Sequence, residues 1–219
     1  GSSGGGRRDA NSFPAQPPVD LTPVEEPSKP EIEPHTYRDL SDAEWAAEAI
    51  QAISKRGIVG GDGTGLFSPN ENITREQFVK IIVNAFSITE SAKEIHFDDV
   101  DKDAWYFSYI QKAYSAGIVN GVTEDRFGIG EFISRQDMAV MIDRVMKTLK
   151  ISLKGRETGT FLDEAAISDY AREAVQRMKR YEIMNGYDGK FDPLSPATRA
   201  QAAVMLNNLL VELEEGTNA

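Results

Sequence analysis

The chain of 219 residues repeats itself three times, and this repetition constrains its fold more than any other feature. Phe67 recurs as Phe127 after 60 positions, and as Phe191 after a further 64. Trp45 likewise recurs as Trp105. Repeats of this size are structural units that bury a core only together with their neighbours. The expected divisions are a linker over 1–35 and repeats over 36–90, 91–150 and 151–219.

Each repeat reads as a helix, a glycine-rich loop and a second helix. In the first repeat, Trp45 and Ile53 recur at helical spacing, Ser41 and Glu44 match a capping box, and Gly57 stands where a C-terminal cap belongs. One such helix pair of about 50 residues is marginal alone. We therefore expect an all-α fold in which three helix-loop-helix repeats form a pseudo-threefold, three-pronged bundle.

Residues 1–35 differ in composition from the rest of the chain. They contain seven of the ten prolines and open with a glycine- and serine-rich run. Such a segment cannot bury enough apolar surface to fold, so we predict a flexible linker, either a simple tail or a spacer to an upstream domain.

Composition argues against several classes of function. The formal net charge is −11, which disfavours nucleic acid and anionic lipid as partners. The absence of cysteine excludes disulfides and zinc–thiolate sites. With only two histidines, the chain also has few residues that could form a histidine-based metal site. No catalytic motif stands out. We expect no cofactor, no metal and no enzymatic activity, since repetition favours multivalent binding over a single active site.

An arginine follows the Thr or Ser that opens the second helix of every repeat. A capping box explains the Thr or Ser and the residue three positions later, but it does not explain the arginine. A cation at the first helical position opposes the helix dipole at a cost of about 0.3–1 kcal/mol. Free N–H groups at helix starts attract anions, so we expect exposed arginines that complete an anion pocket for a carboxylate. The alternative is an arginine that pairs with a neighbouring carboxylate for structure. The residues concerned are Thr74, Arg75 and Gln77; Ser134, Arg135 and Asp137; and Thr198, Arg199 and Gln201.

The ordered set of motifs resembles S-layer homology (SLH) modules, which anchor proteins to the bacterial cell wall. The resemblance rests on an aromatic-x-Asp-Val opening, a tryptophan in the first helix, a Gly-Ile pair before the glycine-rich loop, and the Thr-Arg start of the second helix. These motifs are Phe97-Asp98-Asp99-Val100, Trp45 and Trp105, Gly57-Ile58 and Gly117-Ile118, and the arginine triplets above.

The resemblance implies a pseudo-trimeric monomer that binds secondary cell-wall polysaccharide in grooves between repeats. The ligand would carry a pyruvate ketal, commonly on N-acetylmannosamine, with its carboxylate facing Arg75, Arg135 or Arg199. Helical spacing favours core positions for Trp45 and Trp105, although both can stack on a sugar. Further candidate contacts are Asp39, Asp99 and Asp163.

Departures from the SLH pattern predict unequal grooves. The third repeat has Tyr170 near the tryptophan position and Glu182 in place of glycine, and the second repeat carries Asp137. The leading hypothesis is a secreted, non-catalytic anchor at the cell wall or S-layer surface of a bacterium, with an N-terminal cargo. The alternatives are a module that binds an S-layer or other surface protein through the same grooves, and a glycan-processing enzyme.

Overall fold

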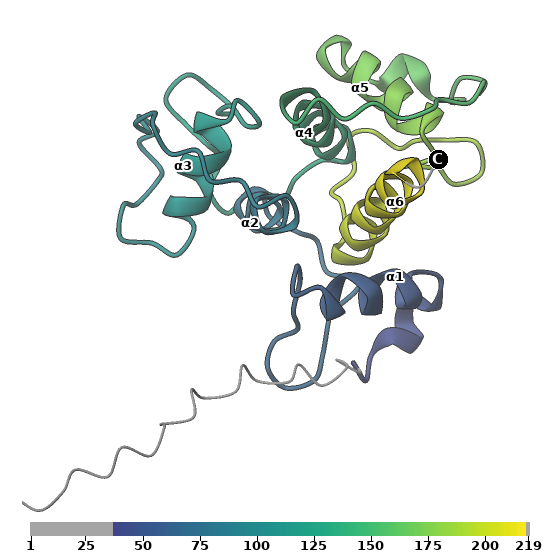
Figure 1. Ribbon diagram of the computed structural model, residues 1–219, viewed down its shortest axis with the longest axis horizontal. Coiled ribbons are helices and arrows are strands. Elements are labelled where there is room, and N and C mark those ends of the chain that lie inside the picture. Colours follow the sequence, from purple (N-terminus) through teal and green to yellow (C-terminus); the bar gives the residue numbers. More distant parts are fainter. Residues whose placement is uncertain (1–36, 218–219) are drawn as a thin grey trace, which may run out of the picture. The chain divides into compact units, whose positions relative to one another are not determined.

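The computed structural model describes residues 37–217, so the linker predicted over 1–35 lies outside the described residues. The described part contains helices joined by loops, and its β-structure is limited to isolated bridges. This confirms the all-α class predicted from the repeats (Figure 1). The elements are η1 (Leu40–Ala43), α1 (Glu44–Lys55), α2 (Arg75–Ala85), α3 (Phe107–Ser115), α4 (Arg135–Thr148), η2 (Glu164–Ala166), α5 (Asp169–Arg180) and α6 (Arg199–Thr217).

The second helix of each repeat begins at the predicted arginine. The backbone N–H of Thr74 donates to Gln77 Oε1 at 3.1 Å, which is half of a capping box. In the second repeat Ser134 Oγ instead accepts from the N–H of Asp137 at 3.2 Å. These local hydrogen bonds satisfy groups that a helix start leaves without partners, so the sequence fixes where the helix begins.

The first helix starts differently from the prediction. The capping box predicted for Ser41 and Glu44 is wrong, because Ser41 lies inside the 3₁₀ turn η1 and α1 begins at Glu44 after Ala43. This turn buries Leu40 and Ala43 against the core. Burial of apolar side chains therefore decides the local conformation here, and the polar pattern does not.

The first helix of each repeat ends in the same tight turn. After α1, Gly57 adopts φ = 70° and the N–H of Ile58 donates to the carbonyl of Ile53 at 3.1 Å. This is the Schellman arrangement, and it confirms the cap predicted at Gly57. Gly117 (φ = 75°) and Glu182 (φ = 55°) occupy the same position in the other two repeats.

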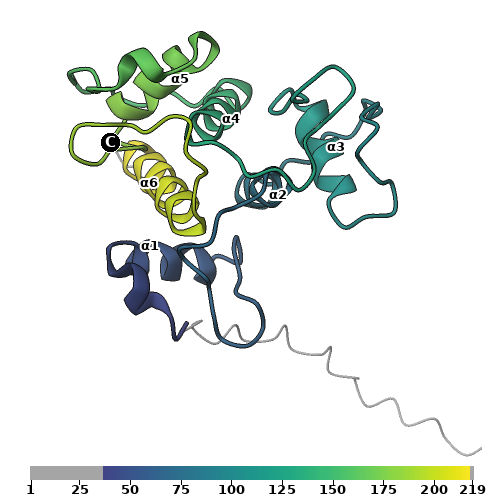
Figure 2. The same cartoon turned by 180° about the vertical axis from the view of Figure 1, so that it is seen from behind.

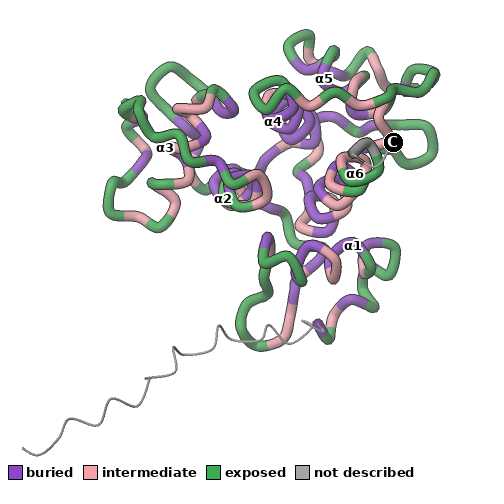
Figure 3. The backbone as a smooth tube through the Cα atoms, in the orientation of Figure 1, coloured by how far each residue is buried: buried purple, intermediate pink, exposed green. Residues whose placement is uncertain are grey.

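The first helix of each repeat packs against the second helix of another repeat. Helix α3 contacts α2, α5 contacts α4, and α1 contacts α6. Helices α2, α4 and α6 lie innermost among the described elements, and α1, α3 and α5 lie outside them (Figures 1 and 2). The repeats are thus interleaved, with most buried residues on the inner helices and the segments that precede them (Figure 3).

A closed ring of backbone hydrogen bonds joins the three repeats just before their second helices. The N–H of Ile73 donates to Ala197 O at 2.9 Å, that of Ala197 to Ile133 O at 2.8 Å, and that of Ile133 to Ile73 O at 3.0 Å. All three residues are fully buried. Buried backbone groups need hydrogen-bond partners, and here each repeat supplies the partner for a backbone group of another repeat. The pseudo-threefold arrangement of the repeats follows from this ring.

Candidate binding grooves

Three grooves lie beside the inner helices, and residues of all three repeats line each one. Their volumes are about 240 Å³ for groove A beside α2, 430 Å³ for groove B beside α4, and 230 Å³ for groove C beside α6. Groove A is lined by Gly60, Gln77, Lys80, Trp105 and Arg199 among others. The matching residues are Asn120, Asp137, Arg144, Tyr170 and Arg75 in groove B, and Trp45, Arg135, Asn185, Gln201 and Asn208 in groove C.

An exposed aromatic side chain forms one wall of each groove. Trp105 is 51% exposed, Tyr170 is 61% exposed and Trp45 is 63% exposed. The core position favoured by their helical spacing is therefore wrong for both tryptophans. Trp45 lies on α1 and borders groove C, whereas Trp105 lies in the turn before α3 and borders groove A. Tyr170 was not among the predicted site residues, and its only sequence signal is its alignment with the tryptophans of the other repeats.

Two of the arginines are buried and the third is half-buried, which corrects the expectation that they are exposed. Arg75 is 6% and Arg135 is 8% exposed, and Arg199 is half-buried. Each guanidinium reaches away from its own helix, donates from Nε to a phenylalanine carbonyl of another repeat, and lies over that same phenylalanine ring. The pairs are Arg75 with Phe127 (3.0 Å), Arg135 with Phe191 (2.8 Å) and Arg199 with Phe67 (2.8 Å).

The first N–H group of each second helix is not free for a ligand, contrary to the prediction. The N–H of Arg75 donates to Glu131 O at 3.0 Å, and that of Arg135 to Ser195 O at 3.1 Å. The N–H of Arg199 is bonded in the same way to a carbonyl of the first repeat. These donors join repeats to one another, so an anion site in the grooves would depend on side chains, among them the arginines.

The second expected role for the arginines, pairing with a neighbouring carboxylate, is also wrong. Within residues 37–217, no carboxylate lies within ion-pairing distance of Arg75, Arg135 or Arg199. Burial in a medium less polar than water lowers the pKa of each guanidinium, although all remain protonated at neutral pH. Each groove therefore contains a desolvated cation that binds carbonyl dipoles and has no ionic partner of its own among the described residues.

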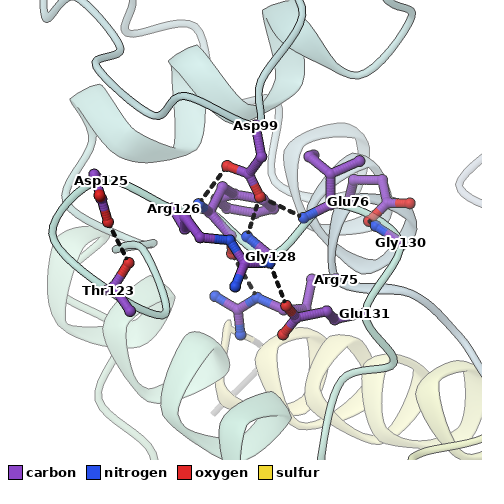
Figure 4. Close-up of polar contacts among 11 residues, drawn as sticks. Arg75, Glu76, Asp99, Thr123, Asp125, Arg126, Gly128, Gly130 and Glu131 are labelled. Carbon is purple, nitrogen blue, oxygen red and sulfur yellow. Dashed lines mark hydrogen bonds and ion pairs between the residues drawn. The ribbon is translucent and has the colours of Figure 1, made fainter.

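Asp39, Asp99 and Asp163 hold the loops that receive the arginines. Asp99 accepts from the N–H groups of Phe127 (2.7 Å), Gly128 (2.8 Å) and Ile129 (3.0 Å), and Arg75 approaches the same loop from its other side (Figure 4). Burial alone would raise the pKa of these carboxyl groups, but the backbone hydrogen bonds lower it. None of the three lines grooves A, B or C, so the structure gives them a supporting position.

The remaining predicted site residues divide into two groups. Gln77, Asp137 and Gln201 line the grooves. The residues that precede the arginines stand at the helix starts and do not line a groove; they are Thr74, Ser134 and Thr198. Lys80 and Arg144 also line grooves, although they lay outside the recurring motif and were missed for that reason.

Groove B differs from the other two in its polar network. Tyr170 Oη donates to Asp137 Oδ1 at 2.8 Å and accepts from Gln136 Nε2 at 3.0 Å. Burial, reinforced by the Asp137 carboxylate, raises the pKa of Tyr170 to about 12. Tyr170 is thus a fixed hydrogen-bond donor, whereas the tryptophans of grooves A and C present mainly an aromatic face.

Comparison with known proteins identifies the repeats. The model of the S-layer homology domain matches residues 36–79, 96–139 and 160–203. An endoglucanase of Bacillus sp. (strain KSM-635) is 32% identical over 80% of this chain and 18% of its own length. The surface-layer 125 kDa protein of Lysinibacillus sphaericus is 26% identical over 78% of the chain and 14% of its own length. A cellulosome-anchoring protein of Acetivibrio thermocellus is 26% identical over 51% of the chain and 26% of its own length.

Within residues 37–217, no helix is both long and apolar enough to cross a membrane. In the same range, no cluster of three or more His, Cys, Asp or Glu side chains is arranged to hold a metal ion.

Proposed function

Because this chain belongs to the S-layer homology (SLH) domain family, we propose that it is a non-catalytic module that anchors an attached protein to a bacterial cell surface. Relatives named as a surface-layer protein and as a cellulosome-anchoring protein support this role. The endoglucanase relative is more than five times as long as the matched segment, so its catalytic activity need not lie in this part. We further propose that the cargo is N-terminal and secreted.

The proposed ligand is a pyruvylated secondary cell-wall polysaccharide, with the ketal on N-acetylmannosamine. The observation that carries this proposal is the buried or half-buried arginine in each groove, which lacks a carboxylate partner among the described residues. A ligand carboxylate would supply that partner through a charge-assisted hydrogen bond. The neighbouring tryptophan of grooves A and C would cover an apolar sugar face.

Binding would proceed by a simple mechanism that requires no chemical step. The arginine is held in place by carbonyl hydrogen bonds and by the phenylalanine ring beneath it, so little side-chain entropy is lost when the ligand binds. A hydrogen bond to a charged group contributes about 1.5–3 kcal/mol. Individual sites would therefore be weak, and several grooves on one polymer would together give firm attachment.

Sedimentation of the protein with purified cell walls tests this function. We expect co-sedimentation with walls that carry the pyruvylated polysaccharide, and loss of at least ~10-fold in bound protein after the polysaccharide is extracted, because wall peptidoglycan alone lacks the pyruvate ketal. Equal binding to both preparations would contradict the proposal. Binding restored by a surface protein, and not by the polysaccharide, would favour the protein-interaction alternative.

A further inference from the structure

We infer that Arg144 is a second anion-binding residue of groove B, so that this groove contacts an acidic saccharide through two arginines, Arg75 and Arg144. The inference rests on the proposed function and deepens it, since it concerns the same grooves and the same class of ligand. The arginines that recur at the helix starts give each groove one cation, and Arg144 lies outside that pattern.

Arg144 stands at a position that is uncharged in the other two repeats. It lies in the third turn of α4, on the helix that begins at Arg135. The matching residue of α2 is Asn84, and that of α6 is Asn208. A shared requirement of the fold therefore does not explain the arginine in the second repeat.

The Arg144 side chain is half-buried and reaches groove B without a partner of its own. It lines this groove together with Arg75 and Tyr170. Within residues 37–217, no hydrogen bond or ion pair holds its guanidinium. The guanidinium is also not among the buried polar groups that lack a partner, so its donors are open to solvent. Its planar fork of N–H donors is therefore left for a ligand.

Arg75 brings the other guanidinium to the same groove in a fixed position. Its Nε donates to Phe127 O at 3.0 Å and its Nη2 to Asn120 O at 3.2 Å. Burial lowers the pKa of Arg75 most, the Asp137 carboxylate opposes this lowering, and the charge of Arg144 adds to it. The two arginines thus repel each other in the free protein, and an anion close to both would relieve this repulsion.

The acidic residue of groove B leaves both arginines available. Asp137 accepts from Ser134 Oγ at 2.7 Å and from Tyr170 Oη at 2.8 Å. Within the described part of the chain, it forms no ion pair with Arg75 or Arg144. The volume of groove B, about 430 Å³, is the largest of the three grooves and gives a ligand room beside two long side chains.

Groove A also has a second cation, but of a different kind. Lys80 is exposed, and its ammonium lies 5.4 Å from the centroid of the Trp105 ring and 5.7 Å from that of Tyr109. Water screens an exposed ammonium, whereas a planar guanidinium can hold a carboxylate at two points. We therefore assign the second arginine contact to groove B alone.

Removal of Arg144 tests the inference in a titration that resolves the grooves. The probe is the methyl glycoside of N-acetylmannosamine with a pyruvate ketal. Heteronuclear NMR follows the backbone N–H of Gly121 for groove B, and the indole N–H groups of Trp105 and Trp45 for grooves A and C. We expect Arg144→Asn to weaken binding at groove B by about 10-fold, the equivalent of one charge-assisted hydrogen bond, and to leave the other two grooves unchanged.

Matched variants separate the anion contact from other effects. Asparagine is the residue that the other two repeats carry, so Arg144→Asn should melt within a few degrees of the parent. Arg144→Lys keeps the charge and should retain more binding at groove B than Arg144→Asn. Lys55→Asn removes one positive charge from α1, outside the three grooves, and should leave every titration unchanged. Asn208→Arg places an arginine in groove C and should strengthen binding there several-fold, which decides the question if Arg144→Asn does not fold.

The outcomes distinguish this inference from the proposed function. Parental binding at groove B in Arg144→Asn would overturn the inference and leave the proposed function standing. The same holds for a parent that binds the probe only at grooves A and C, and for an equal loss of binding with the ketal-free sugar, since Arg144 would then not contact the anion. If Arg144→Asn does not fold, unchanged binding at groove C in Asn208→Arg would overturn it. A parent that binds no probe in any groove would refute the proposed ligand, and the inference with it.

Discussion

At the scale of single residues, the arginines serve the fold as well as the groove. Arg199 shows this clearly, because Nε donates to Phe67 O at 2.8 Å and Nη2 to Gly60 O at 3.0 Å. Both carbonyls belong to the first repeat, far away in sequence. The same guanidinium lies over the Phe67 ring, at 4.7 Å from its centroid. Its orientation in groove A is therefore set before any ligand arrives.

Replacement of Arg199 by lysine separates charge from geometry. The ammonium of Arg199→Lys keeps the charge but cannot reproduce the two-point contact of a planar guanidinium. We expect the free energy of unfolding to fall by up to about 1.5 kcal/mol, because two partly exposed hydrogen bonds of a charged group are lost, and saccharide affinity at groove A to fall by roughly tenfold. Chemical denaturation and calorimetry measure the two effects.

Lys80→Ala is the matched control for this substitution. Lys80 also lines groove A, but its side chain is exposed and stands near the Trp105 ring without a carbonyl partner among the described residues. Its removal should change stability by less than ~0.5 kcal/mol. An Arg199→Lys protein with parental stability and parental affinity would contradict the structural role assigned to the guanidinium.

At the scale of elements, the turn after each first helix places the loop that lines a groove. Gly57 and Gly117 supply the left-handed conformation at no steric cost. Glu182 adopts it in the third repeat despite its side chain, and forms an exposed ion pair with Arg156 at 2.8 Å. Such a pair contributes little, so the third repeat retains a turn that its sequence does not favour.

A glycine-to-alanine pair tests the role of this turn. Nothing lies within 4 Å of a Cβ added at Gly117 or at Gly159, but only Gly117 has a positive φ. Gly117→Ala should lower the free energy of unfolding by about 1–2 kcal/mol through backbone strain alone. Gly159→Ala should leave stability unchanged or raise it by up to ~1 kcal/mol, since the unfolded chain loses freedom. Equal effects in urea unfolding would mean that the turn is not the cause.

At the scale of the whole described unit, no repeat completes its own structure. First helices pack on second helices of other repeats, and the ring through Ile73, Ile133 and Ala197 closes only when all three are present. Each groove likewise takes its arginine, its aromatic wall and its loop from different repeats. The fold and the proposed binding grooves therefore depend on the same interfaces.

The sequence predicts local features of this fold better than its interfaces. The starts of α2, α4 and α6 can be predicted from the sequence because the capping partners lie only three residues apart. The burial of the arginines cannot be predicted from local sequence, because their carbonyl partners lie 52, 56 and 132 positions away along the chain. Helical spacing predicts core positions for Trp45 and Trp105, but it does not distinguish a groove wall from a core face, and Trp105 lies in the turn before α3. Tyr170 could be found only by alignment of the repeats.

We propose that the grooves bind an anionic sugar through arginines that lack ionic partners among the described residues. The most direct test is calorimetric titration of the protein with a pyruvylated cell-wall saccharide and with the same saccharide after the ketal is removed. We predict that removal weakens binding by about 10–100-fold, the equivalent of one charge-assisted hydrogen bond. Affinities that agree within about twofold, a difference of only ~0.4 kcal/mol, would contradict the claim.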